Sequence, residues 1–150
     1  MNKQPDLKIR KAALADLPQI FTLYQELQPD DPPINEKMAA EVWEKSLDSG
    51  VTYFVGETNG TIVATCYVAI ILNITRGCSP IAFIENIITA AAYRRLGIGK
   101  KLLESAIGYA KEQGCYKATL QSNVKRTDAH MFYKSVGFDG NSKKAFEIRF

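Results

Sequence analysis

The sequence has few residues of the types that build disulfide frameworks or metal centres. It contains three cysteines, Cys66, Cys78 and Cys115, and a single histidine, His130. The cysteines are odd in number, widely separated and outside any spacing typical of a metal site. The first residues also lack the apolar core of a signal peptide. We therefore predict a reduced, cytoplasmic protein without a bound metal ion.

Long hydrophobic runs and a strong net charge are also missing. No apolar run approaches the roughly 20 residues that a membrane-spanning helix needs. The 19 basic and 16 acidic residues leave a net charge of +3, which is too small to indicate a nucleic-acid partner. We expect neither a membrane nor a nucleic acid as partner. The length of 150 residues, without repeats or linkers, predicts a single domain over residues 1–150.

Strand and helix patterns alternate along the whole chain. Period-two alternation and β-branched or aromatic residues predict strands at 7–12, 51–57, 61–72, 81–89, 116–122 and 143–150. Apolar residues at helical spacing predict helices at 16–28, 34–47, 97–113 and 126–136. Asn59 and Gly60 predict a tight hairpin turn, and the prolines within 29–33 predict an elbow between two helices. This order of elements predicts an α/β fold with a mixed, mostly antiparallel sheet and helices on both faces.

The segment RRLGIGKK, residues 94–101, joins a predicted strand to a predicted helix. The first four N–H groups of a helix have no acceptor inside it, and the helix dipole adds positive charge there. Glycines at 97 and 99 remove side chains from the approach, and four basic residues surround them: Arg94, Arg95, Lys100 and Lys101. These features predict a cradle for phosphate or pyrophosphate. The alternative is that the glycines only allow close helix-to-sheet packing while the cations face solvent.

Two well-known nucleotide motifs do not fit this segment. A Walker A loop has another glycine five residues before the glycine that precedes its lysine, and Ser or Thr after the lysine. Arg94 and Lys101 occupy those two positions. A dinucleotide-binding fingerprint needs a third glycine where Leu102 stands. Both motifs are therefore excluded.

Three segments together resemble the GNAT superfamily of N-acetyltransferases. RRLGIG, residues 94–99, fits every fixed position of the acyl-coenzyme A loop of that family. FIENIIT supplies an acidic residue in the preceding strand, and AHMFYKSVGF follows at the end of a helix. The order of the predicted elements from residue 6 to 150 also resembles this fold. The resemblance implies an N-acetyltransferase with acetyl-coenzyme A as its cosubstrate.

The resemblance also implies which residues hold the coenzyme. Backbone amides of the loop would bind the pyrophosphate, and they belong to Arg95, Leu96, Gly97, Ile98, Gly99 and Lys100. Arg94 would add side-chain donors, and the backbone of Ile87, Ile88 and Thr89 would pair with the pantetheine arm. Many relatives have an asparagine three residues before the alanine of AHMFY. Arg126 stands there and is a candidate to reach a phosphate instead.

Two side chains are candidates for the proton transfers of acetyl transfer. A primary amine has a pKa of about 10.4, so a base or a water relay must deprotonate it near neutral pH. Glu85 is the only carboxylate in the apolar strand 81–89 and is the candidate base, unless it is exposed or paired with a lysine. The resemblance makes Tyr133 the general acid, whereas its helical spacing alone also fits a core tyrosine. His130 lies about 100° away on that helix, so we expect it to face elsewhere.

The acceptor is less defined than the coenzyme site. We expect a small-molecule or peptide amine, and a homodimer stays open. Asp30 and Asp31 in the elbow are candidates to attract an amine, although aspartate beside proline is also ordinary turn chemistry. For Tyr24 and Trp43 the default interpretation is core packing, and for Arg76 it is a solvated loop within 72–80.

Direct attack of the bound amine in a ternary complex is the predicted mechanism. There is one alternative mechanism, through an acyl-cysteine, and there are two alternative functions. An acyl-cysteine route lacks a histidine near any of the three cysteines in the sequence. A non-catalytic acyl-coenzyme A binding module would keep the loop but would not need Glu85 or Tyr133. A binder of nucleic-acid phosphates would be expected to have a larger net charge. Together the residues favour an enzyme.

Overall fold

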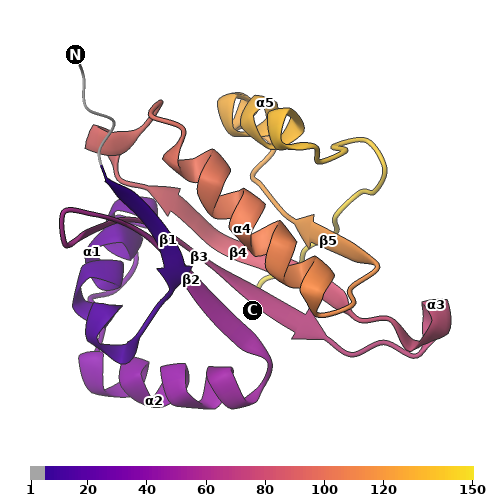
Figure 1. Ribbon diagram of the computed structural model, residues 1–150, viewed down its shortest axis with the longest axis horizontal. Helices are drawn as coiled ribbons and strands as arrows, with labels where there is room; N and C mark the ends of the chain where they lie inside the picture. Colours follow the sequence, from indigo (N-terminus) through magenta and orange to yellow (C-terminus); the bar gives the residue numbers. More distant parts are fainter. Residues whose placement is uncertain (1–5) are drawn as a thin grey trace.

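The computed structural model describes residues 6–150, which contain one five-stranded sheet in the order β1-β2-β3-β4-β5 (Figure 1). The strands are β1 (Leu7–Lys11), β2 (Val51–Thr58), β3 (Thr61–Ile71), β4 (Ile81–Thr89) and β5 (Lys117–Leu120). Neighbouring strands are antiparallel from β1 to β4, whereas β4 and β5 are parallel. The predicted mixed, mostly antiparallel sheet is therefore confirmed.

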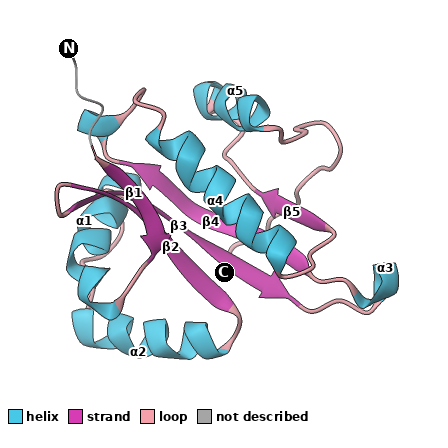
Figure 2. Ribbon diagram, viewed as in Figure 1, coloured by secondary structure: helices cyan, strands magenta, loops and turns pink. Residues whose placement is uncertain are grey.

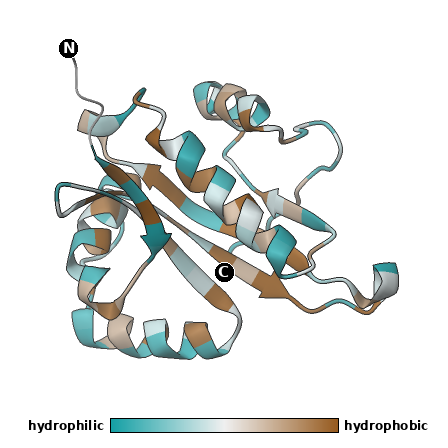
Figure 3. Cartoon of the chain, viewed as in Figure 1, coloured by the Kyte–Doolittle hydropathy of each residue, from teal (hydrophilic) through white to brown (hydrophobic). Residues whose placement is uncertain are grey.

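Helices cover both faces of this sheet (Figure 2). They are α1 (Leu17–Leu27), α2 (Glu36–Asp48), α4 (Ile98–Glu112) and α5 (Thr127–Val136), with short 3-10 turns η1 (Leu14–Asp16) and η2 (Ala91–Tyr93). Successive strand residues point to opposite faces. In β2, Phe54 belongs to the core cluster with α4 and α5, and Val55 belongs to the cluster with α1 and α2. Figure 3 agrees, because the helices carry both hydrophobic and hydrophilic residues, as expected for elements with one buried side.

Local signals in the sequence account for the connections in the first half of the chain. Asn59 and Gly60 have φ values of 50° and 77°, so they form the predicted tight turn between β2 and β3. The proline-containing elbow separates α1 from α2 as predicted. Asn35 then caps α2, because its side-chain oxygen accepts a hydrogen bond from the Met38 N–H at 3.0 Å.

Strand β4 contains a bulge that sets the direction of the residues around it. Asn86 and Ile87 of β4 together lie opposite the single residue Cys66 of β3, and Asn86 has a φ of 51°. In a regular strand, Ile84 and Ile88 would point to the same face. Because of the bulge, Ile84 joins the cluster with α4 and α5, and Ile88 joins the cluster with α1 and α2.

Strands β4 and β5 separate after a short pairing. The pairing runs from Ile81 and Lys117 to Ile84 and Leu120 and then stops. Within residues 6–150, the segment 85–89 has no strand on the side of β5. The sheet is thus open at the carboxyl ends of two parallel strands, a common place for ligand sites in α/β proteins. The start of α4 lies next along the chain.

The prediction of a last strand at 143–150 was wrong. The structure has no strand there, and no backbone hydrogen bond joins this segment to another element of the described chain. Phe146 and Ile148 are 88% and 79% exposed. An alternating sequence favours a strand only when a strand edge pairs with it, and among residues 6–150 no strand edge does so.

The predicted loop within 72–80 contains one short turn, α3 (Thr75–Cys78). Arg76 and Gly77 have φ values of 57° and 67°, so the turn is left-handed at its centre. The guanidinium of Arg76 lies over the ring of Tyr116, 5.9 Å from its centroid. Among the helices of residues 6–150, none is long and apolar enough to cross a membrane.

Candidate active site

A cavity of about 1250 Å³ lies where β4 and β5 separate. Its walls are the second half of β4, the loop before α4, the segment after β5, helix α5, and Glu147 and Arg149 near the end of the chain, with the end of α1 at the rim. The predicted site residues that line it are Glu85, Ile87, Ile88, Thr89, Arg94, Arg95, Gly97, Ile98, Gly99, Lys100, Arg126 and Tyr133. Leu96 is the exception, because it is 51% exposed and does not line the cavity. Residues that are distant in the sequence therefore meet at one opening in the sheet.

The start of α4 presents free N–H groups to this cavity. Gly97 precedes the helix with a φ of 76°, and Arg95 also has a positive φ, 60°. The first N–H to bond within the helix is that of Lys101, which donates to the Gly97 oxygen at 3.2 Å. The N–H groups of residues 98–100 come before it and have no acceptor inside the helix. They remain available for an anion.

The two glycines of this loop are required for different reasons. A Cβ at Gly99 would lie 3.2 Å from Thr89 Oγ1 and 3.3 Å from the ring of Phe132, so a side chain there would push against β4 and α5. A Cβ at Gly97 would meet nothing within 4 Å, but the positive φ of this residue is strained for other amino acids. Close packing thus explains Gly99, whereas backbone conformation at the helix entrance explains Gly97.

Arg94 is held by protein groups at the rim of the cavity. Its Nε donates to the Thr89 oxygen at 3.0 Å, and its Nη2 pairs with Glu26 at 3.0 Å. Glu26 also accepts a hydrogen bond from the Ala91 N–H at 2.8 Å. The end of α1 therefore fixes the loop that leads to α4. The sequence patterns do not reveal Glu26, because it lies 68 positions from Arg94 in a different element.

Polar groups line the gap between β4 and β5. On one side is the backbone of residues 85–89, which faces the cavity. On the other side, Ser122 follows β5, and its hydroxyl is buried without a hydrogen-bond partner in the described part of the chain. Buried polar atoms are rarely unpaired, so this arrangement fits a polar, extended ligand such as the amide-containing arm of a coenzyme. No local pattern around Ser122 predicts this role.

Glu85 lies at the end of a row of aromatic residues that crosses the sheet. It is directly opposite Tyr67 in β3, which in turn is opposite Tyr53 in β2. The Tyr53 and Tyr67 rings meet edge to face at 5.7 Å, and Tyr53 stacks on Trp43 at 4.2 Å. Burial raises the pKa of Glu85, and a hydrogen bond from the Asn86 N–H partly offsets the rise. A raised pKa makes this carboxylate a better base near neutral pH.

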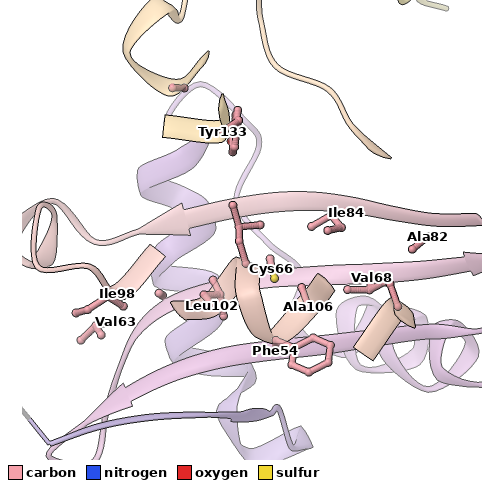
Figure 4. Close-up of a cluster of buried hydrophobic side chains, with 14 residues drawn as sticks. Phe54, Val63, Cys66, Val68, Ala82, Ile84, Ile98, Leu102, Ala106 and Tyr133 are labelled. Carbon is pink, nitrogen blue, oxygen red and sulfur yellow. The ribbon is translucent and has the colours of Figure 1, made fainter. Parts of the chain in front are cut away.

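Tyr133 reaches the cavity from α5, which packs on the opposite face of the sheet. It is 8% exposed, and its ring lies 5.4 Å from that of Phe132 and 6.3 Å from that of Phe138. Figure 4 shows it beside the core cluster that includes Ile84. Burial raises the pKa of its hydroxyl, Arg126 lowers it and the charge on Glu85 raises it. The charge on one candidate catalytic group therefore affects the pKa of the other. Because its pKa is raised, Tyr133 keeps its proton at neutral pH.

Other candidate residues lie outside the cavity. His130 Nε2 is 2.9 Å from the Asn123 oxygen, a contact that ties α5 to the loop before it. Asp30 and Asp31 are exposed in the elbow. None of the three cysteines of the described chain lines the cavity, and burial raises the pKa of Cys66 to about 12, which is unsuited to a nucleophile. Within residues 6–150, no group of three or more His, Cys, Asp or Glu could hold a metal ion.

Comparison with known proteins identifies the family. The model of the acetyltransferase (GNAT) family matches residues 17–138. A putative acetyltransferase from Agrobacterium tumefaciens str. C58 has a solved structure with a TM-score of 0.90 and 40% identity, over 95% of this chain and 99% of that one. Glucosamine 6-phosphate N-acetyltransferase from Trypanosoma brucei brucei is 27% identical over 93% of both chains. Aminoglycoside N(6')-acetyltransferase type 1 from Serratia marcescens is 31% identical over 59% of this chain and 62% of its own length. The chain belongs to the acetyltransferase (GNAT) family and is an acetyl-coenzyme A-dependent N-acetyltransferase.

Proposed function

We propose that this enzyme acetylates the primary amine of a small amino-sugar-like molecule by direct attack in a ternary complex. Two relatives that differ in their acceptors support this class, since one acts on glucosamine 6-phosphate and the other on aminoglycosides. Both kinds of acceptor combine an amine with neighbouring polar groups. The observation that carries the proposal is the position of Glu85 beside Tyr67 at the opening between β4 and β5.

The coenzyme would lie along the open side of β4. The N–H groups of residues 95–100 would hold its pyrophosphate, with Lys100 and Arg126 as nearby cations on the cavity wall. The backbone of residues 87–89 would pair with the pantetheine arm, and the unpaired Ser122 hydroxyl faces the same space. Arg94 would act chiefly by fixing the loop, because Thr89 and Glu26 already occupy two of its donor groups. When bound, acetyl-coenzyme A supplies the activated acetyl group.

The acceptor would approach from the face covered by α1 and α2. Glu85 points to that face, and the aromatic row ends beside it. The Tyr24 hydroxyl of α1 is buried, and the side chain of Asn86 in the bulge of β4 lies near it. Burial raises the pKa of Tyr24, which keeps it a neutral donor. Hydroxyl groups of this kind suit an acceptor that carries hydroxyls next to its amine.

The proton balance assigns one role to each candidate catalytic group. An ammonium acceptor loses two protons when its nitrogen forms the new C–N bond and the thioester C–S bond breaks. Glu85 would take one proton, directly or through water, and pass it to solvent. Tyr133 would give its proton to the leaving sulfur. The second proton lost by the amine would then reprotonate Tyr133, so that the enzyme returns to its starting state. The two residues lie on opposite faces of the sheet, and both line the cavity at the gap between β4 and β5.

Steady-state assays with a panel of amines would test this proposal. Release of free thiol from acetyl-coenzyme A would be measured with glucosamine 6-phosphate, glucosamine, sisomicin, amino acids and a lysine-containing peptide. We expect the highest kcat/KM with an amino sugar. Preference for the peptide would refute the proposed acceptor class. Coenzyme binding without thiol release for any amine would favour the non-catalytic binding module instead.

A further inference from the structure

Glu26 places a negative charge at the rim of a site that binds an anion. It lies in the last turn of α1 and lines the cavity together with Lys100 of α4 and with Arg94 and Arg95 of residues 90–97, here called the coenzyme loop. A carboxylate near these cations reduces the positive potential that attracts a pyrophosphate. Charge alone therefore does not explain why Glu26 stands at this position.

A single oxygen of Glu26 accepts two hydrogen bonds from the coenzyme loop. Its Oε1 lies 2.8 Å from the backbone nitrogen of Ala91 and 3.0 Å from Nη2 of Arg94. The Nε of Arg94 donates to the Thr89 oxygen at the end of β4, at 3.0 Å. The guanidinium is thus held between β4 and α1, and Arg95, with its φ of 60°, follows directly. Glu26 therefore fixes the point at which the loop turns into the anion cradle.

The ion pair between Glu26 and Arg94 adds little to the stability of the fold. Their side chains are 35% and 56% exposed, and water screens ion pairs with this exposure. Its effect on ligand binding is different. A loop that is already held in its binding conformation loses less conformational freedom when the ligand arrives. The position of Glu26 is therefore better explained by the shape that it gives to the coenzyme loop than by the stability of the fold.

We propose that Glu26 is a positioning residue for the coenzyme, and that through it the coenzyme loop and the end of α1 become ordered together when the coenzyme binds. Helix α1 ends at Leu27, one residue after Glu26. Leu27 and Gln28 line the same cavity as the loop. A ligand that fixes the loop therefore also fixes, through the Glu26 carboxylate, the point at which the chain leaves α1.

The elbow after α1, residues 28–35, depends on this anchor. In the described chain, the backbone hydrogen bonds of residues 28–34 are local, from the Gln28 N–H to the Tyr24 oxygen at 2.8 Å and from the Asp31 N–H to the Gln28 oxygen at 3.2 Å. A segment with few hydrogen bonds to the rest of the fold opens easily. An acceptor that approaches from the face covered by α1 and α2 would pass this elbow, so it would bind best after the coenzyme. That consequence rests on the proposed function, whereas the tests below use coenzyme A alone.

Two substitutions of Glu26 separate its position from its charge. Because one oxygen accepts both hydrogen bonds, Glu26→Gln keeps an acceptor in that place and removes only the charge. Glu26→Met has a similar size and removes both the acceptor and the charge. We expect Glu26→Gln to bind coenzyme A within about twofold of the wild type, and Glu26→Met to raise Kd about tenfold, because its loop is ordered only on binding. Isothermal titration calorimetry at one ionic strength would measure both values.

Glu104 provides the matched control. It also lies near the cradle, where its carboxylate is 3.9 Å from Nζ of Lys100 in α4. Glu104→Gln and Glu104→Met each remove one negative charge, so both should leave the Kd of coenzyme A unchanged or lower it slightly. The two Glu104 variants should therefore behave alike, whereas the two Glu26 variants should differ.

Hydrogen exchange would test the link between the loop and α1. In the wild type and in Glu26→Gln, saturating coenzyme A should slow the exchange of amides both in residues 90–100 and in residues 28–31. In Glu26→Met, at a coenzyme concentration that saturates this variant, the protection should be confined to residues 90–100. The elbow would then exchange as it does without coenzyme.

Three results would overturn the proposal. Equal affinities of Glu26→Gln and Glu26→Met for coenzyme A would show that Glu26 acts only as a charge at the rim, as would tighter binding by Glu26→Met than by the wild type. An elbow whose exchange does not respond to coenzyme A in the wild type, or responds alike in Glu26→Met, would show that α1 and the loop are not ordered together. A failure of the proposed function would be seen separately, as the absence of thiol release with amino sugars.

Discussion

Glu85 of β4 lies directly opposite Tyr67 of β3, just beyond the point where the pairing of β4 with β5 ends. Burial raises the pKa of Tyr67, and the charge on Glu85 raises it further. Burial also raises the pKa of Glu85 itself. The pair therefore combines a neutral donor with a carboxylate that binds a proton more readily than an exposed one. Such a carboxylate suits the role proposed for Glu85, the removal of a proton from the acceptor amine.

Glu85→Gln keeps the shape of the side chain and removes its basicity. We expect kcat to fall about 10²- to 10⁴-fold, while coenzyme affinity stays nearly unchanged. In the wild type, kcat/KM should rise with pH as Glu85 loses its proton, and the raised pKa places this limb above the ordinary value of about 4.3. The variant should lack that limb. Steady-state rates across pH would check both points, and near-normal turnover would assign the base to another group.

Gly97→Ala tests the anion cradle against a matched control. Gly97 and Gly60 have nearly the same positive φ, 76° and 77°, and a Cβ would meet nothing within 4 Å at either position. Alanine at either site should therefore cost a similar amount, about 1–2 kcal/mol of backbone strain. Only Gly97→Ala should reduce the rise in thermal midpoint caused by coenzyme A, which for the wild type corresponds to about 2.7 kcal/mol at a hundredfold excess over Kd. Equal responses in the two variants would contradict the cradle.

Local sequence patterns account for most of the fold because they depend on neighbours in the chain. The turn at Asn59 and Gly60 and the helix entrance at Gly97 need particular φ values that few residues adopt, so their positions can be predicted. Glu26 is different, because its role depends on Arg94 and on the tertiary packing of α1. The bulge at Asn86 is intermediate: asparagine tolerates a positive φ, but only pairing with β3 shows which residue leaves the ladder.

The segment 143–150 shows the limit of periodicity most clearly. The alternation from Phe146 to Phe150 predicts a strand, but a strand also needs hydrogen bonds from a neighbour. That neighbour is absent from the described chain, so these residues form no strand, and Phe146, Ile148 and Phe150 are exposed. Periodicity alone therefore identifies a segment whose sequence suits a sheet, and it does not show whether a strand edge is available to pair with it.

Asp16→Asn should reduce stability through a contact away from the active site. The Asp16 carboxylate accepts two hydrogen bonds from Arg10, at 2.7 and 2.9 Å, and one from the Ala13 N–H at 2.7 Å. We expect a loss of about 1–3 kcal/mol in the free energy of unfolding at neutral pH. Asp31→Asn, in the exposed elbow, is the control and should change it by less than about 0.5 kcal/mol.

The Asp16 carboxylate should also make the free energy of unfolding depend on pH. Arg10 lowers the pKa of Asp16, so the carboxylate is favoured in the folded state. Its contribution to stability is fully present above the unfolded pKa of about 3.9 and is lost as the pH falls through the lower folded pKa. Denaturant unfolding from neutral to acidic pH should therefore show a smaller loss in Asp16→Asn than in the wild type. Parallel curves for the two proteins would contradict this prediction.

Tyr133→Phe separates the catalytic role of Tyr133 from its packing, because it keeps the ring and deletes the hydroxyl. A purely structural tyrosine should lose about 0.5–1.5 kcal/mol of stability at most and retain its turnover. A general acid should lose at least about tenfold in kcat, which corresponds to about 1.4 kcal/mol of barrier, without a comparable loss of coenzyme affinity. Both quantities can be measured on the same preparation.

The leaving group provides the sharper comparison for Tyr133. An acetyl donor with a more acidic thiol needs a proton less, so the rate lost by Tyr133→Phe should shrink with that donor. A folding defect would slow both donors alike. Single-turnover measurements, in which the chemical step limits the rate, would compare them directly. Equal losses with the two donors would leave Tyr133, whose raised pKa reflects its burial, as a packing residue beside the thioester. The leaving thiolate would then have to take its proton from water or from the acceptor amine.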